Sequence, residues 1–266
     1  FNFNLKMVEP MSGGRVMKIG FAHIPRTGGT YLEGLLTIMG PDKFINFFGT
    51  PNDQKPNKLG LIEYIERDIG RQADLISIPN WNTAKLFSGH FSLNIHKFLP
   101  EEHEYKYMTI LRNPLNRTIS FIKKVTSSRN FRSEIASDCE INSDKFWHNA
   151  KKYIEDKNKS GLMMHERHGF SDYMTKILAG INLANDCDVD EQVFQKAKHN
   201  LKSMVFVGKF EDYANTVKQV FNLFDLPPRP MQSKTENAHN VPEEIEEFLK
   251  QINQYDFRLY KEAFNE

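Results

Sequence analysis

The sequence predicts an α/β fold, in which a parallel sheet carries helices on both faces. Two observations lead to this prediction. Short apolar runs alternate with amphipathic helical patterns along the chain. Two of the runs, at 19–22 and 106–111, also end in a polar turn that leads directly into a helix. A chain of 266 residues can bury a sizeable core. We therefore expect one domain over residues 17–266, with residues 1–16 as an extension outside it.

The first half of the chain contains three strand signals. Strands are expected at 19–22, at about 84–88 and at 106–111, and helices from Tyr31, at about 60–72 and at 114–125. The first helix has its apolar side chains on one side, at Leu32, Leu35, Leu36 and Met39. Asn113 can cap the helix that Pro114 opens, because proline suits the first helical turn.

The second half continues the alternation. Helices are expected at about 171–179, 190–203 and 211–224, with a strand at 204–208 and a last helix opened by Pro242. The strongest periodic pattern belongs to the helix at 211–224, with Tyr213, Val217, Val220, Phe221 and Phe224 on one face. Ligands of parallel sheets bind at the carboxyl ends of the strands, so the turns that follow the strands are the places to search for a site.

The turn after the first strand reads HIPRTGGT, residues 23–30. A glycine-bearing loop between a strand and a helix presents backbone N–H groups and a helix N-terminus to an anion. Gly28 and Gly29 bring no side chain that would keep the anion away, and Arg26 adds positive charge. A Walker A loop is excluded, because no lysine follows the glycines. The loop therefore predicts phosphate binding; the alternative is a tight turn with an incidental arginine.

The turn after the strand at 106–111 is similar. It reads Arg112-Asn113-Pro114, and Ser120 follows about two turns into the next helix. A forked guanidinium and a hydroxyl can hold a second phosphate of the same ligand. The alternative is a structural arginine and a surface serine.

HIPRTGGT followed by LRNPLNRTIS resembles the sulfotransferases that use 3′-phosphoadenosine-5′-phosphosulfate (PAPS), closest in look to the carbohydrate O-sulfotransferase branch, which includes heparan sulfate 2-O- and 6-O-like enzymes. The resemblance implies a P-loop-like sulfotransferase fold and transfer of a sulfuryl group to a hydroxyl, or an amine, of a carbohydrate or small-molecule acceptor. It places the 5′-phosphosulfate on the first loop and the 3′-phosphate on Arg112 and Ser120. A late loop would close over the donor. The implied donor-binding residues are Arg26, Thr27, Gly28, Gly29, Thr30, Tyr31, Arg112, Ser120, Lys234 and Thr235.

The resemblance also suggests the catalytic residues. Arg26 stands where the family usually has lysine, so it can stabilise charge but cannot release a proton. His90, in Ser-Gly-His after the second strand signal, occupies the place of the catalytic base, and a neutral histidine suits that role. His23 is the second candidate for the base, or a support of the loop.

Residues 126–170 combine aromatic and basic side chains, which suits a polar acceptor; an ordinary surface helix hairpin has the same composition. The aromatic side chains are Phe131, Phe146, Trp147 and Tyr153, with His165 and His168 nearby. Trp81 is either a stacking surface for a ligand or part of the core.

Composition narrows the function classes. A net charge of +1 gives no global signature for nucleic acid. No apolar run is long enough to span a membrane, and no signal peptide is visible, so we expect a cytoplasmic protein; an anchor upstream of Phe1 is compatible with the sequence. Two cysteines, with no metal-ligand spacing, predict free thiols and no metal. Two other classes stay open: a P-loop kinase-like NTP-dependent transferase, and a non-catalytic nucleotide-binding protein. The sequence leaves the acceptor and the oligomeric state open.

Overall fold

The computed structural model describes residues 17–46, 80–99, 103–126, 139–156, 169–181, 188–229 and 240–265. The expected extension at 1–16, the expected helix at 60–72 and the expected lid residues Lys234 and Thr235 lie outside these ranges.

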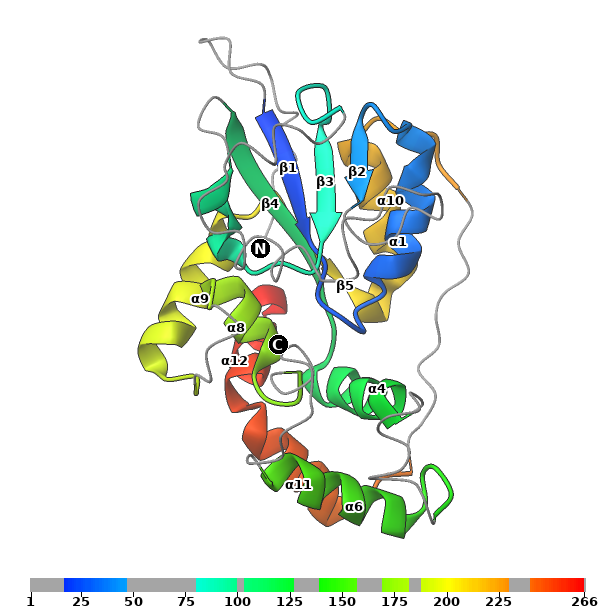
Figure 1. Cartoon of the computed structure of the whole chain (residues 1–266), viewed down its shortest axis with the longest axis vertical. Helices are drawn as coiled ribbons and strands as arrows, with labels where there is room; N and C mark the ends of the chain where they lie inside the picture. The colour runs from blue at the N-terminus through cyan, green and yellow to red at the C-terminus, as the bar shows by residue number, and fades with distance from the viewer. Residues whose placement is uncertain are drawn as a thin grey trace.

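The centre of the molecule is a five-stranded sheet in which every paired strand is parallel (Figure 1). The strand order is β2-β3-β1-β4-β5. The strands are β1 (Met17–Ala22), β2 (Phe44–Asn46), β3 (Leu86–Gly89), β4 (Glu104–Leu111) and β5 (Phe206–Lys209). The predicted parallel α/β fold is therefore confirmed.

The strand order creates a switch point between β1 and β4. After β1 the chain continues to β2 on one side of the sheet, and after β4 it continues to β5 on the other. The connections that leave these two neighbouring strands thus diverge at the carboxyl edge. Ala22, the last residue of β1, pairs with Gly89 of β3 and with Thr109 of β4. Ligands of open parallel sheets bind in the crevice at such a point.

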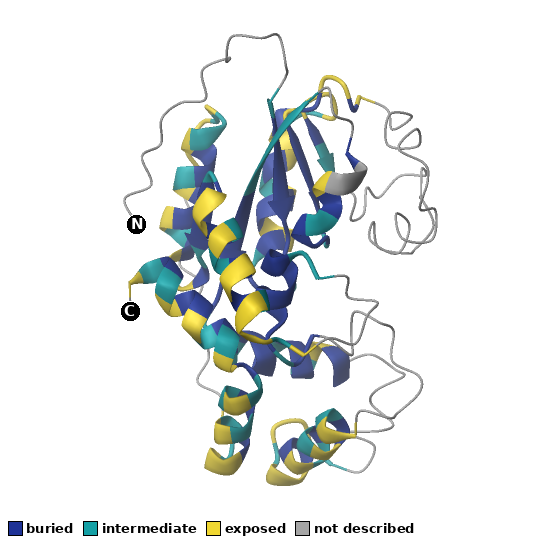
Figure 2. Ribbon diagram, turned by 90° about the vertical axis from the view of Figure 1, so that its left-hand side faces the viewer, coloured by how far each residue is buried: buried dark blue, intermediate teal, exposed yellow. Residues whose placement is uncertain are grey.

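Helices cover both faces of the sheet, as predicted. One face packs α1 (Gly29–Leu36) and α10 (Tyr213–Leu223) over an apolar layer that includes Phe21, Met108 and Ile110. The other face packs α8 (Tyr173–Ala179), α9 (Glu191–Ser203) and α12 (Gln254–Phe264) against Phe87 and Leu111. Figure 2 shows the buried sides of these helices turned towards the strands and their exposed sides turned outward.

A third apolar cluster lies beyond the carboxyl edge of the sheet, where α4 (Pro114–Thr126), α6 (Asp144–Glu155) and α11 (Glu243–Ile252) meet (Figure 1). Trp147 is fully buried there, and its indole N–H donates to the main-chain oxygen of Asn240 (3.0 Å). Phe146 and Tyr153 are buried in the same cluster. The expectation that these three rings face an acceptor is therefore wrong, because they form the core that joins the three helices. Phe131, His165 and His168 lie outside the described residues.

Other elements differ from expectation in detail. Helix α1 begins at Gly29, two residues before Tyr31, and a 3₁₀ turn at Phe210–Asp212 precedes α10. The three-residue strand β2 and the separate helix α12 were not predicted. Trp81 is 1% exposed, so it belongs to the core. Within the described ranges, no helix has both the length and the apolar character needed to cross a bilayer.

Helices α8 and α12 cap each other's N-termini. The Asp172 carboxylate, just before α8, accepts hydrogen bonds from the main-chain N–H groups of Tyr255 and Asp256 (2.9 Å each). In return, the Asp256 carboxylate accepts from the N–H groups of Met174 (3.1 Å) and Thr175 (2.7 Å). Both carboxylates thus satisfy amide donors that a helix leaves without carbonyl partners.

The capping pair carries unusual protonation behaviour. Burial, together with the charge of Asp256, raises the pKa of Asp172 from 3.8 to about 7. Burial also raises the pKa of Asp256, against the opposing effect of the Arg117 charge. The Arg117 guanidinium is fully buried, donates to the Gly169 carbonyl and lies 5.3 Å from the centre of the Tyr173 ring. Arg117 belongs to α4, so these contacts connect α4 to the helices α8 and α12, which cover one face of the sheet.

Candidate active site

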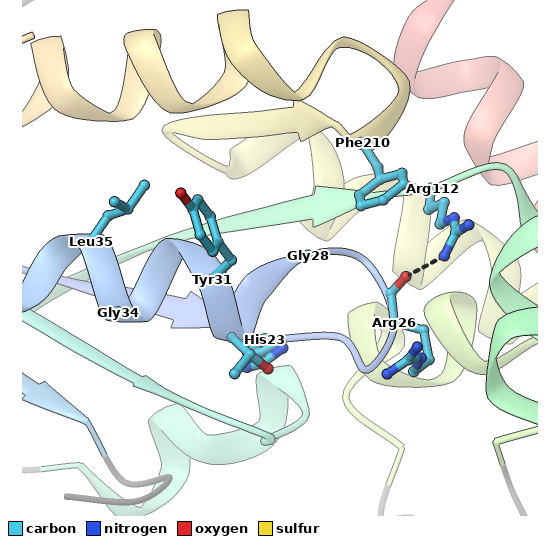
Figure 3. Close-up of a pocket in the computed structure, with 9 residues that line it drawn as sticks. His23, Arg26, Gly28, Tyr31, Gly34, Leu35, Arg112 and Phe210 are labelled. Carbon is cyan, nitrogen blue, oxygen red and sulfur yellow. Dashed lines mark hydrogen bonds between the residues drawn. The ribbon is translucent and has the colours of Figure 1, made fainter. Parts of the chain in front are cut away.

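A pocket of about 600 Å³ opens at the switch point between β1 and β4 (Figure 3). It is lined by His23, Arg26, Gly28, Thr30, Tyr31, Gly34, Leu35, Arg112 and Phe210. The structure thus brings the two turns that the sequence singled out to one cavity. Of the other predicted site residues, Thr27, Gly29, Ser120 and His90 lie close to this lining without belonging to it.

The loop between β1 and α1 is shaped by Gly28. Its φ of +87° is in the left-handed region, and a Cβ there would lie 2.6 Å from the Tyr213 ring. The Tyr213 hydroxyl donates to the Gly28 carbonyl (2.7 Å), which fixes the turn against α10. Thr27 is fully buried, and its hydroxyl donates to the Ile24 carbonyl (2.8 Å). Thr27 can therefore offer a ligand its main-chain N–H but not its hydroxyl.

The loop ends at the N-terminus of α1. The N–H groups of a helix's first turn lack carbonyl partners inside the helix and favour an anion. The N–H groups of Tyr31 and Leu32 already donate to the Gly28 carbonyl (3.2 and 3.3 Å). Binding of an anion by the main-chain N–H groups of residues 27–31 stays a prediction. The Tyr31 ring is 47% exposed at the wall of the pocket.

Arg26 and Arg112 contact each other at the loop between β1 and α1. Arg112 Nη1 donates to the main-chain oxygen of Arg26 (3.1 Å), the dashed line in Figure 3. The Arg112 guanidinium lies 4.3 Å from the centre of the Phe210 ring. Arg26 has a left-handed backbone (φ 73°), and its Nε donates to the Ser120 hydroxyl oxygen (3.0 Å). Ser120, which the sequence associated with Arg112, thus contacts Arg26 directly and joins α4 to the loop.

The electrostatics of the pocket favour an anion. Burial, and next the positive charge of Arg112, lowers the pKa of Arg26 from its ordinary value. The two neighbouring cations repel each other, so an anion bound between them gains attraction from both. The lining residues include no carboxylate. Across the described ranges, no three side chains of His, Cys, Asp or Glu gather closely enough to hold a metal ion.

A buried polar cluster supports one wall of the pocket. The Nδ1 atom of His23 lies 3.0 Å from Oε1 of Glu33, and the Ser88 hydroxyl donates to the same oxygen. The half-buried ring of His90 meets the His23 ring edge to face, with centres 4.4 Å apart. Thus the two histidines considered as bases lie together, and His23 is the one that lines the pocket.

Sequence reasoning missed Glu33. Glu33 is 3% exposed on α1, on the same side of the helix as Gly29 and Leu36. The sequence did contain a signal for Glu33. A carboxylate on the buried side of a short amphipathic helix indicates a specific interaction, because buried carboxylates need hydrogen-bonding partners. Phe210 was also missed, since nothing in its sequence context separates it from a core aromatic residue.

Comparison with known protein families gives a match to one family. The model of the sulfotransferase family matches residues 15–264, which is nearly the whole chain. No curated protein matches the sequence at a significant level. Because the family match extends across the turns after β1 and β4 and across every described strand and helix, this chain belongs to the sulfotransferase family.

Proposed function

We propose that this protein transfers the sulfuryl group of PAPS to a hydroxyl, or an amine, of an acceptor by in-line displacement. The observation that carries the proposal is the meeting of Arg26 and Arg112 in one pocket beside the N-terminus of α1. PAPS has two separate anionic groups, the 5′-phosphosulfate and the 3′-phosphate. Two cations at the ends of two different strands suit such a ligand better than a ligand with one phosphate.

In the proposed complex the 5′-phosphosulfate occupies the loop around Gly28 and the first turn of α1, with Arg26 on its sulfuryl oxygens. Arg112 and Ser120 bind the 3′-phosphate, and the contact of Ser120 with Arg26 connects this site to the loop. The exposed ring of Tyr31 offers a flat apolar surface for the purine. Lys234 and Thr235, outside the described residues, stay predicted contacts of the donor.

Sulfuryl transfer requires positioning, charge stabilisation and removal of the acceptor's proton. We assign charge stabilisation to Arg26, which stays protonated throughout. We assign proton removal to His90, whose ring lies against His23 at the pocket wall. The acceptor oxygen forms a bond to sulfur while the bond from sulfur to the bridging oxygen breaks, and the acceptor's proton passes to the imidazole. The acceptor class that we propose is a carbohydrate, in line with the motif resemblance.

Binding of the product 3′-phosphoadenosine-5′-phosphate (PAP) tests the donor. PAP should raise the melting temperature without magnesium, because a ligand at 100 times its Kd stabilises the folded state by about 2.7 kcal/mol. ATP at the same concentration should stabilise less. Equal stabilisation by ATP, or a strict need for magnesium, would favour an NTP-dependent transferase.

Turnover is tested separately, with radiolabelled PAPS and a panel of sulfated and unsulfated oligosaccharides, phenols and amines. Label should appear in an oligosaccharide. Label in a phenol or amine alone would contradict the carbohydrate assignment. Tight PAP binding without transfer to any acceptor would indicate a non-catalytic nucleotide-binding protein.

A further inference from the structure

We propose that Glu33 is a positioning residue, which orients His23 and stabilises positive charge on the His23–His90 pair when the acceptor loses its proton. This inference rests on the proposed sulfotransferase activity. It assigns a role to a buried carboxylate that touches neither the pocket nor the donor.

The hydrogen bonds at Glu33 fix the tautomer of His23. As a carboxylate, Glu33 only accepts hydrogen bonds, and we infer that the Nδ1 atom of His23, 3.0 Å from Oε1, carries the proton that it accepts. The Ser88 hydroxyl, which donates to the same oxygen, holds the carboxylate in place from β3. In neutral His23 the Nε2 atom is therefore unprotonated. A carboxylate that fixes an imidazole beside the proposed base is the arrangement of an orienting group.

The His23 ring has little freedom to leave this orientation. It stacks on Phe21, with ring planes 3° apart, and its main-chain N–H donates to the Gly89 carbonyl (3.0 Å). A Cβ at Gly29 would lie 2.5 Å from Nε2, so this nitrogen sits close against the first turn of α1. His23 thus touches the phosphate loop on one side and His90 on the other. A change in its orientation would disturb both.

The charge of Glu33 matters as well. Among the described residues, the charged and titratable groups near His23 and Glu33 include His90 after β3, Tyr213 on α10, and Arg26, Tyr31 and Arg112 in the lining of the same pocket. The positive charge of Arg26 disfavours a second positive charge on the histidine pair. A donor anion bound to Arg26 would offset this repulsion. Glu33 is 3% exposed and lies 3.0 Å from the His23 ring, so its carboxylate is placed to attract positive charge that develops on the histidine pair during transfer. The proton that leaves the acceptor hydroxyl therefore meets a histidine pair with a built-in counter-charge.

The first test needs no activity. ¹⁵N NMR of the histidine rings in the full chain reports which nitrogen carries the proton, and the His23 signal is assigned by its loss in His23→Asn. We expect Nδ1–H in the wild type near pH 8. Glu33→Gln keeps an oxygen that can accept from His23 and Ser88, so the tautomer should persist. Glu33→Met keeps the side-chain length but removes the acceptor, so the two tautomers should mix.

The second test is kinetic, with PAPS and an acceptor identified in the panel. Glu33→Gln removes only the charge, so kcat at neutral pH should fall about 10-fold, the difference between a charge-assisted and a neutral contact. The kcat of Glu33→Met should fall further, by about 10²-fold. Glu33→Asp, which restores a carboxylate, should recover part of the loss.

PAP affinity should stay within about twofold in Glu33→Gln, which keeps an acceptor for His23 and Ser88 and so keeps the His23 ring against the phosphate loop. Glu33→Met releases the His23 ring, so its kcat is compared with that of the wild type at saturating PAPS. Thr126→Val is the matched control: Thr126 is equally buried, but its hydroxyl donates only within α4. It should leave the tautomer and kcat unchanged. Two results would overturn the proposal: an Nε2–H tautomer in the wild type, or a folded Glu33→Met with wild-type kcat. Failure of the wild type to bind PAP would instead refute the proposed function. The NMR measurement of the His23 tautomer would remain valid in that case.

Discussion

Two glycines of α1 provide a matched test of how tightly the pocket is built. A Cβ at Gly29 would lie 2.2 Å from Cδ2 of His23, whereas a Cβ at Gly34 would meet nothing within 4 Å. The His23 ring cannot retreat easily, because it lies between Phe21 and Glu33. Overpacking of this kind costs about 1–3 kcal/mol. Alanine in place of a helical glycine otherwise gains about 0.5–1 kcal/mol.

We therefore expect Gly29→Ala to lower the free energy of unfolding by about 2 kcal/mol and Gly34→Ala to raise it by about 0.5–1 kcal/mol. For a chain of this size each kcal/mol shifts Tm by roughly 2–4 °C, so the two variants should differ by on the order of 10 °C. Urea unfolding of the ligand-free protein, followed by far-UV circular dichroism, measures both values. Equal stability of the two variants would refute the close contact between α1 and His23.

Three further predictions concern the two turns and the capping pair. Arg112→Ala should weaken PAP binding by about 2–3 kcal/mol and leave adenosine 5′-phosphosulfate binding nearly unchanged; calorimetry showing equal losses would mean that Arg112 acts through folding. His90→Ala should lower turnover by roughly 10²–10⁴-fold with PAP affinity preserved, and a nearly fully active variant would move the base to His23. The folded state binds the proton of Asp172 more tightly than the unfolded chain does, because the pKa of Asp172 is raised from 3.8 to about 7. The free energy of unfolding should therefore fall as pH rises from about 4 to 7. Asp172→Asn should reduce this slope, whereas Asp225→Asn, at another left-handed but exposed position, should not; equal slopes in both variants would contradict the assignment.

The sequence was informative where local patterns decide the structure. A strand, a glycine-bearing turn and a helix follow one another within twenty residues, so β1 and α1 could be predicted with the loop between them. The same holds for β4 and α4. That Arg26 and Arg112 share a pocket followed from the rule that parallel strands present their carboxyl ends at one edge.

Contacts between distant segments were harder to predict. Nothing local ties Glu33 to Ser88, which is 55 positions away in the sequence, or Trp147 to Asn240, which is 93 positions away. Trp147 was interpreted as an acceptor surface because its neighbours are charged. The helices that bury it come from three separate parts of the chain. The sequence paired Ser120 with Arg112 as ligands of one phosphate, which stays a prediction; the hydrogen bond from Arg26 to Ser120 could not be predicted, because it depends on the left-handed backbone at Arg26.

The mutual caps of α8 and α12 have a consequence for how the chain is made. A ribosome releases β1 to β4 and α8 well before residue 256, so α8 emerges without the carboxylate that binds its first N–H groups. Burial of those N–H groups without partners would cost free energy, so α8 cannot settle onto the finished sheet at that stage. Stable packing of α8 on this face of the sheet therefore requires α12. A nascent chain stalled before α12 should therefore stay sensitive to protease around residues 169–181.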